Sequence, residues 1–459
     1  MSEERSDALV LFGATGDLAH KKIFPALYAM VEHGELTEPV IGVALDDWDV
    51  KKLQERARDG IKSAVGKVDD GVFSRLASLL SYVSGDYRDQ TTFDKLKKAL
   101  GDRRRPLHYL AVPPSMFEPV VQGLEQSGAA VGARLMVEKP FGRDLQSARW
   151  LNRVLHLVFE EDKIFRIDHF LGKEAIQNLV YFRFANSFLE PIWNRNYISS
   201  VQITMAEDFG VQGRGRFYDE VGCIRDVIEN HLLNIMLLLA MEPPNDRSTE
   251  ELLDEKVQVL RAIRTLSKDD VVRGQFKGYL EEPGVAPNSP VETFAAVRLF
   301  VDTWRWQGVP FFIRAGKCLP VHSTEVVVRF RKPPLDVFDP IDGRETNYIR
   351  FGIDPDVSIR IGARRKKPGD EMVGEQVELL ALDEGKDDMP PYERLIGDAM
   401  NGNAQLFTRQ DASEIAWRIV QPVLDDKTPP HVYDPGTWGP ADAMKGFGPV
   451  NGWVDPVTK

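Results

Sequence analysis

The sequence predicts an α/β protein: an N-terminal domain on a doubly wound parallel sheet, then a larger α+β domain with a big, mainly antiparallel sheet. Up to about residue 168, short apolar runs alternate with helical segments, which is typical of a parallel sheet covered by helices. Beyond residue 290, long segments alternate apolar and polar residues, which is typical of antiparallel strands with one wet face. At 459 residues the chain is too long for one core. We expect domains at residues 1–168 and 169–459.

The first predicted strand, residues 8–12, is followed at once by a glycine turn, Gly13-Ala14-Thr15-Gly16-Asp17-Leu18-Ala19, and then by helical spacing through Ile23 and Leu27. A strand, a glycine turn and a helix form the first unit of a Rossmann-like, dinucleotide-binding domain, in which a pyrophosphate lies at the helix N-terminus. The spacing here is Gly-x-x-Gly, whereas Gly-x-Gly-x-x-Gly is commoner. Taken alone, the motif also fits an ordinary structural turn.

Further strands are predicted from apolar runs that alternate with helical or loop segments, at residues 40–45, 80–84, 107–112 and 134–137. In a doubly wound sheet the ligand crevice lies at the carboxyl ends of the strands. Lys139, in the segment Glu138-Lys139-Pro140, lies at that edge and can reach both a cofactor and a substrate. The alternative is a solvated surface lysine. The Lys139–Pro140 bond is a candidate for the cis form.

The end of the first domain is predicted to contain an amphipathic helix at residues 145–159 and a short strand at 164–167. Gly172 then allows the backbone to turn, and we expect Lys173 to open another helix. Apolar residues of that helix follow the three-or-four spacing of a buried face: Ile176, Leu179, Val180 and Phe184.

The strand at 164–167 delivers Asp168 and His169 to this predicted turn, and Lys173 follows shortly after. A helix N-terminus has unpaired backbone N–H groups and a positive dipole end, which together attract anions. With an imidazole and an ammonium beside it, the segment can bind a phosphate group on a small substrate. The alternative interpretation is a structural Asp–His pair next to a surface lysine.

A long helix is predicted at residues 219–241, after a strand at 198–205 that leads to Glu207. On an α-helix, Asp226 and His231 would lie roughly 140° apart around the axis. We therefore expect them on two walls of one space, with Asn230 on the face of Asp226. His231 is a candidate catalytic residue, and the alternative is a satisfied histidine of the core.

The rest of the chain is predicted to form the large sheet and its helices. Residues 245–270 have a charged, helical pattern, strands are expected at 292–305, 309–314, 325–331, 347–353 and 357–361, and helices at 392–407 and 413–423. Such a sheet needs helices on its other face, and its edge or remaining face suits a dimer interface. Arg314 and Lys317 bring two positive charges to the end of one strand.

Composition disfavours several classes of protein. The net charge of −12 disfavours nucleic acid and anionic membranes as partners, because both attract basic faces, and no apolar run approaches a membrane span. Two cysteines, Cys223 and Cys318, make neither a disulfide framework nor a zinc site, so we expect a cytoplasmic protein. The carboxylates show no metal-ligand spacing, and we expect no metal.

These parts fit hydride transfer from a hydroxyl-bearing carbon to a dinucleotide. Removing the hydride requires that the hydroxyl proton leave too, and an imidazole, with a pKa of about 6.5, can accept it near neutral pH. A carboxylate on the far ring nitrogen fixes the tautomer and stabilises the imidazolium. Asp168 and Asp226 are both candidates for that carboxylate.

A series of motifs extends along the chain: Gly13 to Ala19 with Lys21 to Pro25, Tyr109 to Ser115, Glu138 to Gly142, Arg166 to Glu174, Arg225-Asp226 to Asn230-His231, Val285 to Ser289, Trp304 to Lys317, and Tyr392 to Leu395. In these motifs, and over nearly its full length, the chain resembles the glucose-6-phosphate dehydrogenase family. So many separate motifs in one order make coincidence very improbable.

The resemblance implies oxidation of glucose 6-phosphate at C1 to 6-phosphoglucono-1,5-lactone, the first step of the pentose phosphate pathway, with NADP or NAD. It implies that His231 is the base and Asp168 its orienting carboxylate. A homodimer or homotetramer is expected. The other implied roles are His169 and Lys173 as phosphate ligands, Glu207 and Asp226 on sugar hydroxyls, Lys139 between sugar and nicotinamide, Lys317 closing the sugar pocket, and Gly13, Ala14, Thr15, Gly16, Asp17, Leu18 and Tyr109 at the coenzyme.

The chain departs from the family at the end of the second strand. The family commonly has an arginine there that pairs with the 2′-phosphate of NADP, whereas this chain has Leu45-Asp46. The carboxylate of Asp46 suits a ribose 2′-OH. We therefore expect appreciable, even preferred, use of NAD, unless Thr15 or Lys21 compensates.

Smaller departures follow Lys317. His322 stands where the family usually has a lysine or arginine near the sugar, and Ser323 stands where animal enzymes carry a lysine for a structural NADP. Asp354 lies in a segment that departs from the family's Arg-x-Gln-Pro. We expect no separate structural coenzyme site, and weaker sugar binding.

Two other functions compete with this interpretation. A dehydrogenase of another hexose 6-phosphate would use the same phosphate cradle, which does not read ring stereochemistry. A paralogue that serves only as a binding partner would be expected to lack the base or the cradle. The chain retains both His231 and the cradle residues, which favours an enzyme.

Overall fold

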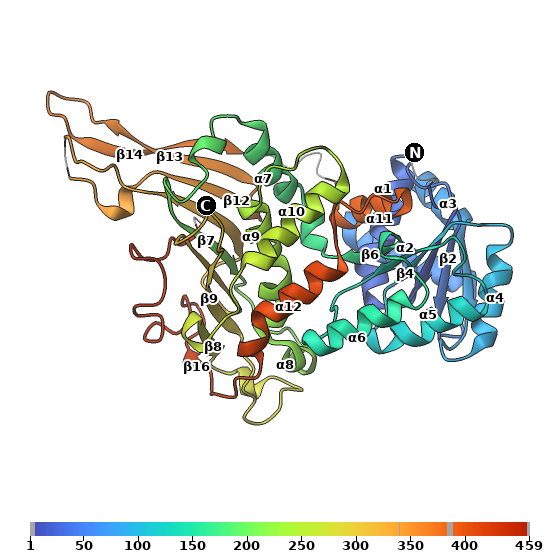
Figure 1. The fold of residues 1–459 in the computed structure, drawn as a ribbon. Coiled ribbons are helices and arrows are strands. Elements are labelled where there is room, and N and C mark those ends of the chain that lie inside the picture. Colours follow the sequence, from blue (N-terminus) through green and yellow to red (C-terminus); the bar gives the residue numbers. More distant parts are fainter. Residues whose placement is uncertain (1–4, 339, 383–388, 457–459) are drawn as a thin grey trace. The chain divides into compact units, whose positions relative to one another are not determined.

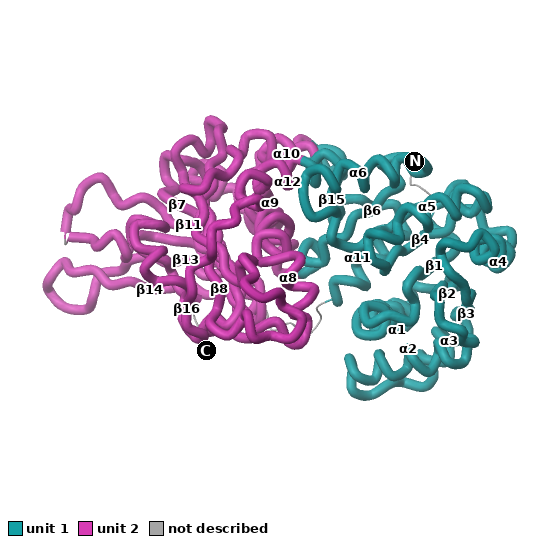
Figure 2. Tube along the Cα trace, turned by 90° about the horizontal axis from the view of Figure 1, so that it is seen from below, with its two compact units in different colours: residues 1–173, 246–253, 389–414 teal, residues 174–245, 254–388, 415–459 magenta. Residues whose placement is uncertain are grey.

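The computed structural model describes residues 5–338, 340–382 and 389–456 of the protein. It contains two compact units, which Figure 2 distinguishes. Unit 1 consists of Met1–Lys173, Asp246–Leu253 and Met389–Glu414, and unit 2 of Glu174–Asn245, Asp254–Asp388 and Ile415–Lys459. Unit 1 therefore takes in two later segments of the chain, which a boundary drawn in sequence order between residues 168 and 169 leaves out.

The sheet of unit 1 has the strand order β15-β6-β5-β4-β1-β2-β3. Its strands β3-β2-β1-β4-β5-β6 pair in parallel, in the order typical of dinucleotide-binding folds. The doubly wound domain is thus confirmed. β1, β2 and β4 are buried along their whole length, as expected for central strands of a parallel sheet. The short strand β15 joins β6 in antiparallel pairing.

The strands β1 to β6 of unit 1 agree closely with those expected from the sequence (Figure 1), whereas the helix expected at residues 392–407 ends at Asn401. The elements of unit 1 are β1 Ala8–Phe12, η1 Ala19–Ile23, α1 Phe24–Glu32, β2 Val40–Ala44, α2 Val50–Val65, α3 Asp70–Leu79, β3 Leu80–Ser84, α4 Gln90–Leu100, β4 Pro106–Leu110, η2 Pro114–Met116, α5 Phe117–Gln126, β5 Arg134–Val137, α6 Leu145–His156, η3 Glu161–Lys163, β6 Ile164–Ile167, η4 His169–Gly172, α11 Pro391–Asn401 and β15 Phe407–Thr408.

Side-chain caps define several helix starts in this unit. Asp144 accepts a hydrogen bond from the N–H of Ser147 (2.7 Å) and forms a capping box at the start of α6. Asp49 caps α2 by accepting from the N–H of Lys52 (2.9 Å). Such caps satisfy the unpaired N–H groups of a first turn, so these helices begin where a short acidic side chain is available.

Among the described residues, the sheet of unit 2 has nine strands in the order β14-β13-β12-β11-β7-β10-β9-β8-β16. Most neighbours are antiparallel, whereas the β7–β10 and β8–β16 pairs are parallel. The prediction of a big, mainly antiparallel sheet is confirmed. α7 packs on β12 and α9, and the helical segment η6 packs on β10 (Figure 1).

The elements of unit 2 are α7 Glu174–Ala185, η5 Glu190–Ile192, β7 Ile198–Ala206, α8 Gly215–Cys223, η6 Ile224–Leu232, α9 Leu233–Ala240, η7 Lys268–Asp270, β8 Val271–Phe276, η8 Tyr279–Glu281, β9 Phe294–Phe300, β10 Pro310–Gly316, β11 Ser323–Phe330, η9 Gly343–Glu345, β12 Tyr348–Asp354, β13 Ser358–Lys366, β14 Gly374–Leu382 and β16 His431–Tyr433. Two further helices, α10 Thr249–Ala262 and α12 Gln410–Leu424, contain residues of both units.

Some elements differ from the sequence-based expectation. β8, β14, β15 and β16 were not predicted, because these strands owe their extended form to pairing with neighbouring strands. On α7, Ile176 and Leu179 are buried as expected, whereas Val180 and Phe184 are half-buried. Within the described part of the chain, no helix has both the length and the apolar character that crossing a bilayer requires.

Candidate active site

The glycine turn after β1 has the geometry of a dinucleotide cradle. Gly13 has a φ of +79°, and a Cβ atom there would lie 2.3 Å from the carbonyl oxygen of Ala111, so only glycine fits. The hydroxyl of Tyr87 accepts from the N–H of Gly13 (2.8 Å) and donates to the carbonyl of Val43 (2.9 Å). Helical backbone begins directly after Gly16. A glycine turn, whose backbone a ligand can approach closely, followed by a helix N-terminus is suited to bind a pyrophosphate.

Asp46, after β2, is held by one side chain at its carboxylate and by another at its backbone carbonyl. Thr15 Oγ1 donates to Asp46 Oδ2 (2.6 Å), and Tyr82 Oη donates to the carbonyl of Asp46 (2.7 Å). Lys21 Nζ lies 3.1 Å from Asp17 Oδ2, and this hydrogen bond lowers the pKa of Asp17. Thr15 and Lys21, the two residues able to compensate for the missing arginine, are therefore both engaged with carboxylates.

A buried carboxyl group lies after β5, next to the predicted site residue Lys139. Tyr109, fully buried on β4, donates from its hydroxyl to Glu138 Oε1 (2.6 Å). Burial raises the pKa of Glu138 to about 7 and raises the pKa of Tyr109 as well. The Lys139–Pro140 bond is cis, as the sequence suggested. The hydroxyl of Tyr109, a residue expected at the coenzyme, is thus directed to Glu138.

The predicted phosphate cradle contains a short helix that the sequence did not predict. Residues His169–Gly172 form the 3-10 helix η4, and α7 begins at Glu174, so the expectation that Lys173 opens the helix is wrong by one residue. Asp168 is 2% exposed and caps η4 by accepting from the N–H of Phe170 (3.0 Å). Lys173 Nζ lies 4.3 Å from the centroid of the Phe170 ring. One tight segment therefore holds the carboxylate, the imidazole and the ammonium.

Helix α11, from much later in the sequence, supports this segment. The ring of His169 stacks on that of Tyr392, with centroids 6.2 Å apart and 9° between the planes. A Cβ atom on Gly172 would lie 2.9 Å from the carbonyl oxygen of Pro391. The φ of Gly172 is not positive, so the close approach of α11, and not a turn conformation, explains this glycine. The predicted reason for Gly172 was wrong.

The predicted helix of residues 219–241 is not one regular α-helix. α8 contains a kink at Gly222 (φ 71°), and residues Ile224–Leu232 form the π-helical segment η6 before α9 begins. In a π-helix the hydrogen bonds join residues five apart, so Asp226 and His231 lie about one turn apart on the same face. The expected separation of roughly 140° was wrong, because it assumed α-helical geometry.

Asn230 ties the π-helical segment to its own backbone. Its Oδ1 accepts from the N–H of His231 (2.6 Å), and its Nδ2 donates to the carbonyl of Arg225 (3.1 Å). His231 is 2% exposed. Single π-helical turns occur frequently at functional sites, and here one orients the histidine that the sequence identified as a candidate base.

Lys317 and Glu207 form an ion pair at the ends of two parallel strands. β7 and β10 are parallel neighbours whose pairing ends together, so both residues emerge at one sheet edge. Lys317 Nζ lies 2.6 Å from Glu207 Oε2, and Lys317 is 3% exposed. The rings of Phe209 and Tyr218 flank the ammonium at 5.2 and 5.0 Å. Sequence reasoning missed both aromatic residues, since only the fold brings them to the lysine.

Two departures from the family form a pair with each other. His322 Nε2 lies 3.2 Å from Asp354 Oδ2. The ring of His322 stacks on Phe209 (centroids 5.9 Å apart, 25° between planes), and the same phenyl ring flanks Lys317. The structure of unit 2 thus brings the predicted residues Glu207, Lys317 and His322 together around one aromatic side chain.

The strand order and the glycine turn place unit 1 among the domains that bind nicotinamide dinucleotides, the class used by oxidoreductases acting on CH–OH donors. Comparison with known proteins identifies the family. Residues 10–178 match the family description "Glucose-6-phosphate dehydrogenase, NAD binding domain", and residues 180–449 match "Glucose-6-phosphate dehydrogenase, C-terminal domain". The chain belongs to the glucose-6-phosphate dehydrogenase family.

Individual relatives agree over nearly the whole chain. A glucose-6-phosphate 1-dehydrogenase of Mycobacterium bovis is 46% identical over 452 residues, which cover 98% of this chain and 97% of that protein. A crystal structure of the Mycobacterium avium enzyme shares 46% identity with a TM-score of 0.93, covering 100% of both chains. A glucose-6-phosphate dehydrogenase solved with its substrate shares 34% identity with a TM-score of 0.91, covering 99% of this chain and 100% of that one.

Proposed function

We propose that this protein oxidises glucose 6-phosphate at C1 to 6-phosphoglucono-1,5-lactone, the first step of the pentose phosphate pathway, with a nicotinamide dinucleotide as hydride acceptor. Membership of the family carries this proposal. The test is the initial rate of coenzyme reduction with glucose 6-phosphate, compared with the rates for other hexose 6-phosphates. A higher kcat/KM for another hexose 6-phosphate would contradict it.

In this proposal His231 is the general base and Asp168 the carboxylate that orients it. The coenzyme, when bound, accepts the hydride from C1. His231 takes the proton of the C1 hydroxyl, because the oxygen must become a carbonyl as the hydride leaves. Asp168 fixes the tautomer and stabilises the imidazolium. Asp226, on the face of the π-helical segment that carries His231, is suited to hold a sugar hydroxyl near the reacting carbon.

The remaining residues bind the sugar phosphate in the same proposal. His169 and Lys173 bind the phosphate, because the segment they share combines an imidazole and an ammonium ahead of α7. Glu207 accepts from sugar hydroxyls, and Lys317, held by its ion pair with Glu207, closes the sugar pocket. In the same proposal, Lys139 lies between the sugar and the nicotinamide, and His322 lies beside the sugar.

We further propose that NAD serves as coenzyme to an appreciable extent. Leu45 is 68% exposed at the end of β2 and offers no charge to a 2′-phosphate. The Asp46 carboxylate, oriented by Thr15, suits a ribose 2′-OH and repels a phosphate. The residues that could cradle the pyrophosphate are Gly13, Ala14, Thr15, Gly16, Asp17 and Leu18.

The two coenzymes should therefore differ only modestly as substrates. We expect kcat/KM for NADP to exceed that for NAD by less than about a hundredfold, which corresponds to ~2.7 kcal/mol, or to be the smaller of the two. Initial rates at saturating glucose 6-phosphate, with each coenzyme varied in turn, measure the ratio. A preference for NADP beyond about a hundredfold would reject the proposal while leaving the reaction itself unaffected.

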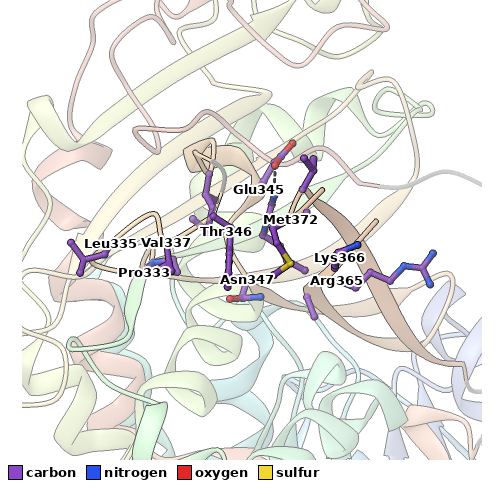
Figure 3. A pocket seen from close by; sticks show the side chains of 15 residues that line it. Pro333, Leu335, Val337, Glu345, Thr346, Asn347, Arg365, Lys366 and Met372 are labelled. Carbon is purple, nitrogen blue, oxygen red and sulfur yellow. Dashed lines mark hydrogen bonds and ion pairs between the residues drawn. The ribbon is translucent and has the colours of Figure 1, made fainter. Parts of the chain in front are cut away.

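We also propose that the protein forms a homodimer or a homotetramer through the large sheet. β14 is an edge strand, and Leu379, Leu380 and Leu382 on it are 63%, 49% and 49% exposed. A pocket of about 460 Å³ lies beside it, lined by residues that include Leu335 and Met372 (Figure 3). A long, apolar edge favours pairing with another chain, and a second copy in two-fold symmetry is the commonest partner.

Charges on this edge should weaken the assembly. The unaltered protein should have at least twice its chain mass of 51.8 kDa by light scattering, and Leu380→Lys with Leu382→Lys should shift it toward the chain mass. The two lysines would face each other across the interface and resist desolvation. Leu157→Lys, which changes another exposed leucine, serves as the control. A monomeric unaltered protein would contradict the proposal.

The cysteines support a cytoplasmic location, which we propose for this protein. Cys223 and Cys318 are both free thiols, and burial raises the pKa of each. A raised pKa keeps them in the unreactive thiol form, and free thiols persist in reducing compartments. The net charge of −12 is in keeping with a small-molecule substrate and with no nucleic acid or membrane as partner.

A further inference from the structure

The carboxyl group of Glu138 connects two tyrosines that come from distant parts of the sequence. Tyr109 on β4 pairs in parallel with Met136 on β5, and Glu138, two residues after Met136, points to the same side of the sheet. The Tyr109 hydroxyl donates to Glu138 Oε1 at 2.6 Å. Helix α11 packs against β5, and the Tyr392 hydroxyl at its start lies near enough to Glu138 to lower the pKa of that carboxyl, against the larger effect of burial. One buried carboxyl thus faces two tyrosine hydroxyl groups.

Each end of this cluster leads to a proposed site residue. Lys139 follows Glu138 directly in the chain, so the orientation of the carboxyl and the path of the lysine backbone are coupled. Tyr392 presents its ring to His169, parallel within 9° and at 6.2 Å. A displacement of the Tyr392 hydroxyl would therefore tilt the ring on which the imidazole rests.

We propose that Glu138 is a positioning residue, which through the hydroxyls of Tyr109 and Tyr392 holds Lys139 and His169 in the arrangement that one sugar phosphate requires. The inference rests on the proposed function, because it takes the roles of Lys139 and His169 from there. It also assigns a role to the Tyr392-Glu393-Arg394-Leu395 motif, which the proposed reaction leaves without one.

Geometry and charge indicate that the ionised carboxyl is the form that holds both tyrosines. Both oxygens of a carboxylate can accept a hydrogen bond. A protonated carboxyl carries an O–H group on one oxygen, and this group must itself donate to an acceptor. The groups that face the cluster are Tyr109 on β4, Lys139 beside it, Tyr392 on α11 and, acting on Tyr392, Asp168. Burial raises the pKa of Glu138 to about 7, so the carboxyl ionises in the pH range in which the enzyme's base must also lose its proton.

Glu138→Gln tests the role, because the amide preserves the shape and cannot ionise. We expect kcat/KM for glucose 6-phosphate to fall about tenfold, and the low-pH limb of log(kcat/KM) to lose about one unit of slope, since one ionisation has been removed. A purely structural carboxyl would leave the slope unchanged. Glu125→Gln removes an exposed carboxylate from α5 of the same unit and should remain within about twofold of the unaltered protein.

A double-mutant cycle with Tyr392→Phe tests the connection. Phenylalanine keeps the ring beside His169 and removes the hydroxyl, so it should lower kcat/KM severalfold. The double variant should have a kcat/KM no lower than that of the less active single variant. If the losses of the two single variants multiply in the double variant, the inference is overturned. A Glu138→Gln variant with normal kcat/KM and a normal slope would overturn it as well. If circular dichroism shows that Glu138→Gln does not fold, the Tyr392→Phe variant alone decides. An unchanged kcat/KM in that variant would overturn the inference. Absence of turnover in the unaltered protein would instead contradict the proposed function.

Discussion

Replacing His231 by asparagine should lower kcat for glucose 6-phosphate oxidation by about 10²–10⁴-fold, the usual contribution of a general base. Asparagine is close to the imidazole in size and polarity, but it cannot take the hydroxyl proton. Glucose 6-phosphate binding should be nearly unchanged, because the proposed phosphate ligands lie on another segment of the chain. Initial rates give kcat, and titration calorimetry gives the Kd of the sugar phosphate.

His431→Asn is the matched control for this variant. His431 is an exposed histidine on β16, and its replacement should leave kcat within about twofold. Normal turnover in His231→Asn would move the base to another residue. A large loss of binding without a loss of kcat would show that His231 holds the substrate and does not take its proton.

The double substitution Leu45→Arg with Asp46→Ser should change the coenzyme preference by about a hundredfold toward NADP, or ~2.7 kcal/mol. Arginine supplies charge-assisted hydrogen bonds to a 2′-phosphate, each worth roughly 1.5–3 kcal/mol. Serine removes the carboxylate that repels the phosphate. It also frees the hydroxyl of Thr15, which donates to Asp46 in the unaltered protein. The ratio of kcat/KM for NADP to that for NAD measures the change.

Leu45→Gln separates charge from side-chain length in this experiment. Glutamine extends from the same exposed position without a positive charge, so the ratio should change by less than about threefold. An equal change in Leu45→Gln would show that the size of the side chain sets the preference. An unchanged ratio in the double variant would place the 2′-phosphate away from β2.

The sequence predicted the strands of unit 1 well because each carries its own signal. β1 and β3 begin and end at the expected residues. β1 is buried on both faces and is therefore an uninterrupted apolar run, whereas β3 lies at the edge of the sheet and alternates buried and half-buried side chains. The edge strand β14 was missed. Its side chains are half-buried or exposed, so pairing with β13, and not a hydrophobic face, makes it a strand.

At the candidate site, the sequence supplied the proposed reactive residues but not their surroundings. Asp168, His169 and Lys173 follow from one local segment, whereas Tyr392 joins His169 only because α11 packs into unit 1. The relation of Asp226 to His231 was predicted wrongly, because apolar spacing does not distinguish an α-helix from a π-helical turn.

By itself, the sequence determined the doubly wound domain, the glycine turn after its first strand and the family, and it supplied the residues that we propose for the reaction. These depend on local patterns: periodic burial, glycine where a side chain would collide, and short motifs. Only the tertiary structure decided that α11 supports the phosphate segment, that His231 and Asp226 share a face, and that Glu138 connects two tyrosines. Each of these three features depends either on which distant segments pack together or on the pitch of a helix. The spacing of apolar residues in the sequence specifies neither the packing nor the pitch.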